Sequence, residues 1–223
     1  MNNFQEIILA ISVYAIPVLF AISLHEVAHG LVARYFGDPT AANEGRLSLN
    51  PIRHIDPFGT ILLPLVLYVL HIVPFGYAKP VPVEYDRLRN PKKQMALVAA
   101  AGPAANFIMG LAWTVFFVLL SGFGVQERFF LEMAHAGVSV NAAMLVFNLI
   151  PLPPLDGGRI VTGLLPMGLA RRYARIERYS VFVFVGLIVL MQLHILDGVL
   201  QAGITAVMRL FSLLVLPLSY LVS

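Results

Sequence analysis

The stretch "SLHEVAHGLVARYFG", residues 23–37, places two histidines and a glutamate close together in a run that otherwise has the composition of a membrane helix. Ionisable side chains at membrane depth are costly and mark functional sites. His25 and His29 are four residues apart, so on a helix both imidazoles lie on one face and can bind the same metal ion. Glu26 follows directly, close enough to act on a water at the metal without being a ligand. The stretch therefore predicts a metal site with an adjacent base.

The composition around this stretch is that of a membrane protein. The chain has 223 residues, of which 59% are hydrophobic and 12% charged, and its mean hydropathy is +0.82. Soluble domains have about 45–50% apolar and about 25% charged residues. We expect an all-α integral membrane protein that forms a single domain over residues 1–223, with a catalytic core at about 7–165 and a C-terminal helical pair at about 179–221.

Cysteine and charge usage exclude other classes. With no cysteine, the chain has neither a disulfide framework nor a thiolate metal site. The pI near 9.3 comes from basic residues that cluster beside apolar runs, which is the positive-inside pattern of membrane proteins. We therefore expect the lipid bilayer, and not nucleic acid, as the surrounding partner.

About five segments are long and apolar enough to cross a bilayer, which takes about 20 residues. They lie at about 7–34, 94–121, 131–150, 179–196 and 199–221. A sixth apolar run, residues 58–76, is shorter and is interrupted by Pro64 and Pro74. We predict that this run is a re-entrant segment that enters the membrane and returns to the same side.

The distribution of basic residues favours the re-entrant interpretation. If residues 58–76 crossed fully, four basic residues would face outward against ten inward. If they re-enter, thirteen of the fifteen Lys and Arg residues face the cytoplasm, Arg128 stays outside and Arg209 falls within the last span. This topology predicts an N-terminus outside and an active site toward the cytoplasm.

A third metal ligand is needed, because zinc sites use at least three protein ligands. The best candidate is Asp156 in "NLIPLPPLDGGRI", residues 148–160, where a proline-rich break and two glycines allow a tight turn. The alternative is a solvated aspartate in a helix-end turn. The re-entrant topology brings both motifs to the same side of the membrane, as a shared ion requires.

Three motifs in series carry a family resemblance. "LHEVAHG", "AAAGPAANFIMG" and "NLIPLPPLDGGRI", within residues 20–165, resemble the site-2 protease family of intramembrane zinc metalloproteases. The connecting stretches "GRLSLNPIRHIDPFGT" and "FGYAKPVPV" resemble a compact bacterial subgroup without PDZ or CBS domains. The resemblance implies one Zn²⁺ per chain held by His25, His29 and Asp156, with Glu26 as catalytic base. It also implies cleavage of a transmembrane protein substrate near the cytoplasmic face of a bacterial inner membrane.

Further polar residues have two interpretations each. Asn106 lies among small residues that permit close helix approach, so it either bonds a neighbouring helix or helps to hold substrate. Asn148 either donates to the developing oxyanion or makes a helix-terminal hydrogen bond. His54 either fixes a cytoplasmic loop near the site or contacts the metal as a regulatory ligand.

A short β-like segment is expected beside the active site. "YAKPVPVEY", residues 77–85, alternates like a strand, and its prolines confine it to a sheet edge. Such an edge could pair with an unwound substrate by strand addition.

Two other functions use the same residues. A membrane metal transporter or metal sensor could employ the His/His/Asp set as a transit site, but the other spans lack a line of ionisable groups. An inactive, scaffolding relative is disfavoured because Glu26 is present and no ligand is missing.

Overall fold

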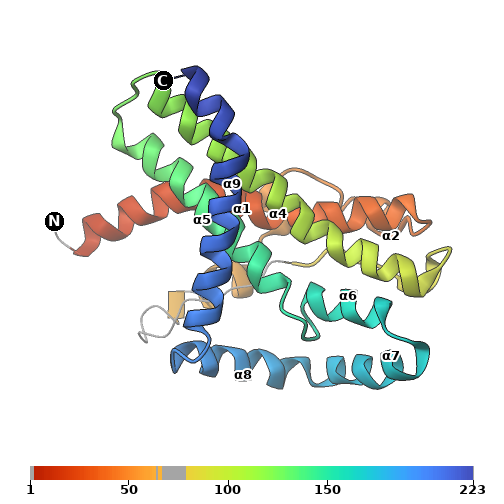
Figure 1. The fold of residues 1–223 in the computed structure, drawn as a ribbon. Coiled ribbons are helices and arrows are strands. Elements are labelled where there is room, and N and C mark those ends of the chain that lie inside the picture. Colours follow the sequence, from red (N-terminus) through yellow and green to blue (C-terminus); the bar gives the residue numbers. More distant parts are fainter. Residues whose placement is uncertain (1–2, 64, 67–78, 223) are drawn as a thin grey trace.

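Four long helices dominate the structure, a computed structural model that describes residues 3–63, 65–66 and 79–222 (Figure 1). They are α1 (Asn3–Tyr35), α4 (Pro91–Gly122), α5 (Arg128–Asn148) and α9 (Asp197–Val222). The shorter elements are α2 (Thr40–Asn43), η1 (Pro51–His54), the π-helix η2 (Pro57–Leu62), η3 (Tyr85–Arg87), α6 (Asp156–Leu164), α7 (Met167–Ala174), η4 (Arg175–Tyr179) and α8 (Ser180–Gln192). The described residues contain no strand, so the expected helical class is confirmed.

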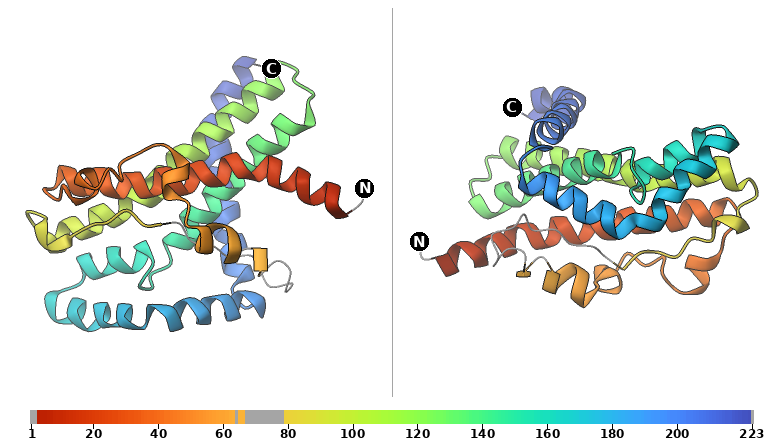
Figure 2. Two further views of the ribbon diagram at one scale, coloured as in Figure 1. Left: turned by 180° about the vertical axis from the view of Figure 1, so that it is seen from behind. Right: turned by 90° about the horizontal axis from the view of Figure 1, so that it is seen from below.

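Helix α4 is the centre of the bundle and contacts α1, α5, α6 and α9. Together with α5 it lies between α1 and α9 (Figure 2). Glycines on these helices make the close approach possible, since a side chain there would overlap a neighbour. A Cβ on Gly110 would overlap the ring of Phe211, and one on Gly137 would overlap Trp113. Small residues at helix interfaces are the usual means of tight packing in membranes.

The contacts fix the directions of the long helices. Ala33, near the end of α1, packs against Val98 near the start of α4, so these two helices are antiparallel. Gly122, at the end of α4, lies beside Val222 at the end of α9. Helix α9 therefore runs parallel to α4 and begins at the side of the bundle where α5 ends.

Four helices among the described residues are long and apolar enough to span a membrane. Their apolar segments are Ile11–Tyr35, Pro91–Gly122, Arg128–Asn148 and Asp197–Val222. The fifth expected span, 179–196, corresponds to α8, which has 13 residues and is therefore about 20 Å long. A hydrocarbon core is about 30 Å thick. The membrane class is thus established, with four of the five expected spans supplied by long helices.

Two other expectations fall on the connection between α1 and α4. The proposed re-entrant run at 58–76 lies mostly outside the described residues, and its described start is η2 followed by a short helical piece. Asp56 caps η2, because its Oδ1 accepts hydrogen bonds from the N–H groups of Phe58 (3.0 Å) and Gly59 (2.7 Å). The described part of the β-like segment, residues 79–84, is neither helix nor strand.

Candidate metal centre

The two histidines of the first motif lie side by side on α1, as their spacing predicts. The His25 and His29 rings meet edge to face with centroids 4.7 Å apart, and their Nε2 atoms are 3.0 Å apart. His25 is buried, and the side chain of His29 is 13% exposed. One face of the helix thus presents two imidazole nitrogens to a common point.

Asp156 reaches this point because the helical path is interrupted after α5. Helix α5 ends at Asn148, a proline-containing turn follows, and Asp156 is the first residue of α6. A Cβ on Gly157 would overlap the carbonyl of Leu149, and one on Gly158 would overlap the backbone of Pro153. The two glycines of the "DGG" sequence therefore let the start of α6 pack directly onto the turn.

Three potential ligand atoms converge at the centre of the bundle. Asp156 Oδ2 lies 3.1 Å from His25 Nε2 and 3.4 Å from His29 Nε2. Ligands of a tetrahedral zinc ion with bonds of about 2.0–2.2 Å are about 3.3–3.6 Å apart, so this triangle is close to the size that the ion requires. Among the described residues, His25, His29 and Asp156 are the one group of three such side chains placed closely enough to share an ion.

The outer nitrogens of both imidazoles are already engaged. His29 Nδ1–H donates to the carbonyl of Val98 at 2.7 Å, and His25 Nδ1–H donates to Asn106 Oδ1 at 2.6 Å. A carbonyl can only accept, so these partners assign the proton to Nδ1 and leave a lone pair on each Nε2. Metal-binding histidines are oriented in this way by their surroundings.

The point where the three side chains meet is therefore lined by hydrogen-bond acceptors and has no donor from these three residues. Two Nε2 lone pairs face the Oδ2 atom of Asp156, which is buried without a hydrogen-bond partner among the described residues. Facing lone pairs and a carboxylate repel one another unless a cation lies between them. The donor set, two imidazoles and one carboxylate, is a known zinc set with a position left open for water or substrate.

Gly102 on α4 is part of this centre, although its sequence motif showed only a run of small residues. A Cβ on Gly102 would lie 2.5 Å from His25 Nε2 and would also overlap His29 Nε2. The missing side chain therefore makes room directly beside the two lone pairs.

Asn106 connects the centre to α5. Its Nδ2 donates to the Ala21 carbonyl (3.2 Å) and to Asn141 Oδ1 (3.0 Å), which turns its Oδ1 toward His25. Asn141 in turn donates to the Gly137 carbonyl at 2.8 Å, and both asparagines are fully buried. The geometry shows the expected interhelical hydrogen bond, whereas a contact of Asn106 with substrate stays a prediction. Asn141 was not singled out from the sequence, because a lone asparagine on an apolar helix has no local pattern.

Glu26 is held by the segment of residues 79–89, here called the strap, which runs along α1. Val81 N–H donates to Glu26 Oε2 at 2.8 Å. Proline on either side of Val81 leaves this N–H as the only donor of residues 80–82. Gly30 allows the contact, because a Cβ there would lie 2.8 Å from Val81 Cγ1.

The strap is fastened at several points along its length. Lys79 N–H donates to the His54 carbonyl (3.0 Å), and Arg46 donates to the carbonyls of Lys79 (2.9 Å) and Pro80 (3.3 Å). Arg159 of α6 donates to the Tyr85 hydroxyl at 3.2 Å. The backbone beside Glu26 is therefore tied both to the preceding loop and to the helix that carries Asp156.

The two remaining candidate residues lie in local structure. Asn148 Nδ2 donates to the Met144 carbonyl at 3.0 Å, which is the helix-terminal hydrogen bond expected as one alternative; an oxyanion role stays a prediction. His54 is buried and donates from Nε2 to the Ser48 carbonyl at 2.8 Å. It fixes the loop before η2 and is not among the three grouped ligand residues.

Fold and site together define a helical membrane protein with a His/His/Asp group that could hold a metal ion. The family model of peptidase family M50 matches residues 13–138 and 126–193. The "Putative zinc metalloprotease YwhC" of Bacillus subtilis strain 168 is 35% identical over 98% of this chain and 100% of its own length. The chain belongs to peptidase family M50, the site-2 protease family, and is a zinc metallopeptidase.

Mycobacterial proteins share part of the chain. Rip2 of Mycolicibacterium smegmatis, which carries the same zinc metalloprotease description, is 33% identical over 62% of this chain and 52% of its own length. Rip2 of Mycobacterium tuberculosis H37Rv is 29% identical over the same shares. No solved structure matches the chain.

Proposed function

We propose that this peptidase cleaves transmembrane protein substrates within the membrane, in regulated intramembrane proteolysis. The observation that carries the proposal is the depth of the site. His25 lies ten residues before the end of the apolar segment Ile11–Tyr35, which is about 15 Å along the helix. Asp156 contacts His25, and Glu26 is the next residue on the same helix, so all of these groups lie at this depth. The peptide bond to be cut must therefore reach a site inside the helical bundle.

The residues have separate roles in this proposal. His25, His29 and Asp156 hold one zinc ion, which when bound activates water and polarises a carbonyl. Glu26 accepts the proton of the attacking water and passes it to the leaving amine. Asn106 and the Val98 carbonyl keep the two imidazoles in the required tautomer. Asn148 remains a candidate donor to the oxyanion.

Substrate access fits the broken path of the chain at the site. A transmembrane helix hides its carbonyls in hydrogen bonds to residues four positions later and must unwind before cleavage. The turn between α5 and α6 interrupts the bundle at the metal centre, as irregular backbone does where it lines a polar cavity. The strap lies beside Glu26, where an extended substrate would enter.

We further propose an orientation in a bacterial inner membrane with the N-terminus outside. Arg34 and the start of α4, with Lys92 and Lys93, then face the cytoplasm, in agreement with the positive-inside rule. Because α9 begins where α5 ends, residues 149–196 return to the cytoplasmic side before α9. A periplasmic reporter such as alkaline phosphatase fused at the N-terminus should be active, and an inactive fusion would disprove this orientation.

The variant Glu26→Gln tests the proposed reaction. Glutamine keeps the size and the acceptor for Val81 but cannot take up a proton. We expect the variant to bind one zinc ion per chain but not to cleave a single-span reporter protein in vesicles. Mass spectrometry of the reporter detects any cleavage products. The exposed Glu44→Gln serves as the matched control and should cleave normally. Unchanged cleavage by Glu26→Gln, or loss of its zinc, would refute the assigned role.

The transporter alternative gains no support from the described residues. A transport path needs several metal-binding sites in succession. Among the described residues, three ligand-type side chains come together at one place only. Arg209, the ionisable residue in the middle of α9, would repel a cation.

A further inference from the structure

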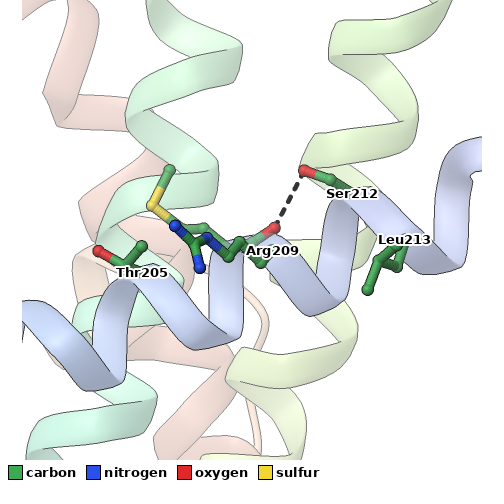
Figure 3. A pocket seen from close by; sticks show the side chains of 5 residues that line it. Thr205, Arg209, Ser212 and Leu213 are labelled. Carbon is green, nitrogen blue, oxygen red and sulfur yellow. Dashed lines mark hydrogen bonds between the residues drawn. The ribbon is translucent and has the colours of Figure 1, made fainter.

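The outer face of α9 carries a polar patch at the middle of a spanning helix. Thr205, Arg209, Ser212 and Leu213 project from the same side of α9, away from the helices behind it (Figure 3). Their spacing of three and four residues places them on one helical face. With Met208 they line a surface hollow of about 540 Å³. We call these five residues the α9 patch.

The position of Arg209 makes the patch unusual. It lies twelve residues after Asp197 and thirteen before Val222, so it is about 18 Å from the start and about 20 Å from the end of the helix. Each distance is beyond the reach of an arginine side chain, so its charge cannot extend to a headgroup layer. A charged side chain in the middle of a bilayer requires a protein partner or a water-filled cavity.

Among the side chains that the structure describes, no carboxylate pairs with Arg209. The stretch of residues 64–78 contains no Asp or Glu, so it has no side-chain carboxylate to offer. The opposite face of α9 holds Phe211 and Val215, which are buried. Arg209 therefore faces away from α4 and α5 and from the metal centre behind them.

We propose that the α9 patch binds a transmembrane helix of a partner protein that carries an Asp or Glu near the centre of the bilayer. The carboxylate would neutralise Arg209 by a bidentate pair, which arginine favours. Thr205 and Ser212 add hydroxyl groups above and below the charge, and Leu213 adds apolar contact. A charge at one depth selects a partner whose carboxylate lies at the same depth.

A second copy of this chain is not the proposed occupant. A two-fold dimer with its axis along the membrane normal would bring Arg209 of one copy against Arg209 of the other. The like charges would repel without a counter-charge in a low-dielectric medium. The surface also lies apart from the metal centre, so its partner is a regulator or an adaptor and its binding does not depend on the peptidase reaction.

Synthetic single-span peptides in vesicles test the proposal. The full chain with Gln126→Cys is labelled there with a fluorescent donor, because it contains no other cysteine. It is reconstituted in phosphatidylcholine vesicles with leucine-rich peptides that carry a quencher and a central Glu, Gln or Leu. We expect the Glu peptide to bind on the order of tenfold more tightly than the Leu peptide, with the Gln peptide below the Glu peptide.

Variants at Arg209 decide whether the patch is responsible. Arg209→Leu should abolish the preference for the Glu peptide, and Arg209→Lys should retain part of it. Arg171→Leu, an exposed substitution on α7, should leave the preference unchanged. Zinc content, measured on each variant, reports correct folding.

Three results would overturn the proposal. They are equal binding of the Glu and Leu peptides, a preference that survives Arg209→Leu, and a preference that disappears when phosphatidylglycerol replaces part of the phosphatidylcholine. The last result would mean that an anionic lipid, and not a helix, neutralises the arginine. Peptidase activity of Arg209→Leu is measured separately, so failure of this proposal leaves the proposed reaction intact.

Discussion

The metal centre and the α9 patch both place ionisable side chains at membrane depth, yet they differ in how those groups are satisfied. At the centre, His25 is bound by Asn106 and His29 by the Val98 carbonyl, both from α4. With Asp156 from α6, three helices (α1, α4 and α6) therefore contribute polar atoms to the centre. On α9, Arg209 faces outward with no ion-pair partner in the described part of the chain.

The difference separates two ways of keeping polar groups in a membrane. Groups that point into the bundle obtain hydrogen bonds from neighbouring helices, and the remaining acceptors at the metal centre require only a cation. A group that points out of the bundle must be satisfied by something outside the chain. We therefore expect changes near the centre to act through zinc binding and changes on α9 to act through association with a partner.

The largest effect is expected from Gly102→Ala, which adds one methyl group beside the two histidines of the metal centre. The new Cβ would lie 2.5 Å from His25 Nε2 and would also overlap His29 Nε2, in the space that the two lone pairs face. We expect zinc affinity to fall by about 100-fold or more, with loss of cleavage, because overpacking must displace a ligand. Competition with a fluorescent zinc chelator measures the affinity.

Gly186→Ala on α8 is the matched control, because a Cβ there meets nothing within 4 Å. It should bind zinc normally and keep its thermal stability. Normal zinc affinity in Gly102→Ala would show that the centre does not lie against α4 as described.

A smaller effect is expected from Asn141→Leu, which removes an acceptor two hydrogen bonds away from His25. Without Asn141 Oδ1, the amide of Asn106 loses its hydrogen bond to α5 at 3.0 Å, keeps the one to the Ala21 carbonyl and holds His25 less firmly. Loss of outer partners of metal ligands costs about 10- to 100-fold in affinity, and we expect the lower end here. The visible spectrum of the cobalt-substituted protein should shift as well, because it reports ligand geometry.

The double variant Asn106→Leu with Asn141→Leu tests whether the two residues act as one relay. Its loss of zinc affinity should be smaller than the combined losses of the two single variants, because both remove the same support. Independent effects, or a cobalt spectrum unchanged in Asn141→Leu, would assign Asn141 to packing alone.

The ligand set could be predicted from the sequence because its signals are local. Two histidines at i and i+4 share a helix face in any α-helix, and Asp156 lies at a break that the neighbouring prolines and glycines mark in the sequence. Composition was sufficient for the helical membrane class. The structure brings His25, His29 and Asp156 together as that interpretation required.

Other parts of the site could not be predicted because they depend on contacts between distant segments. The acceptor for His29 is a backbone carbonyl, which any residue at position 98 provides equally. Val81 reaches Glu26 only because the strap folds back over α1. The span at 179–196 was expected from hydropathy alone, whereas α8 stops after 13 residues, and the side on which α9 begins depends on its packing against α4 and α5.

Asp38 extends the comparison to a buried carboxylate outside the spanning segments, and it gives the smallest expected effect. It is 1% exposed and accepts hydrogen bonds from Thr40 and from Glu84 N–H at 2.7 Å, which fastens the strap to the end of α1. Burial opposes its ionisation, but these bonds and Arg87 outweigh burial and lower its pKa below the usual value. The stabilisation is therefore complete above about pH 4 and is lost as the pH falls through the lowered pKa.

Asp38→Asn tests this role, because an amide N–H₂ would oppose the Glu84 N–H or leave it unpaired. We expect the free energy of unfolding at pH 7 to fall by about 1 kcal/mol, which thermal melting in detergent measures. The difference from the original chain should shrink as the pH falls below about 4, and it should vanish once the pH has passed through the lowered pKa and the folded carboxyl is protonated. The exposed Asp86→Asn in the same strap should change little at either pH. A difference independent of pH would mean that shape, and not charge, holds the strap beside Glu26.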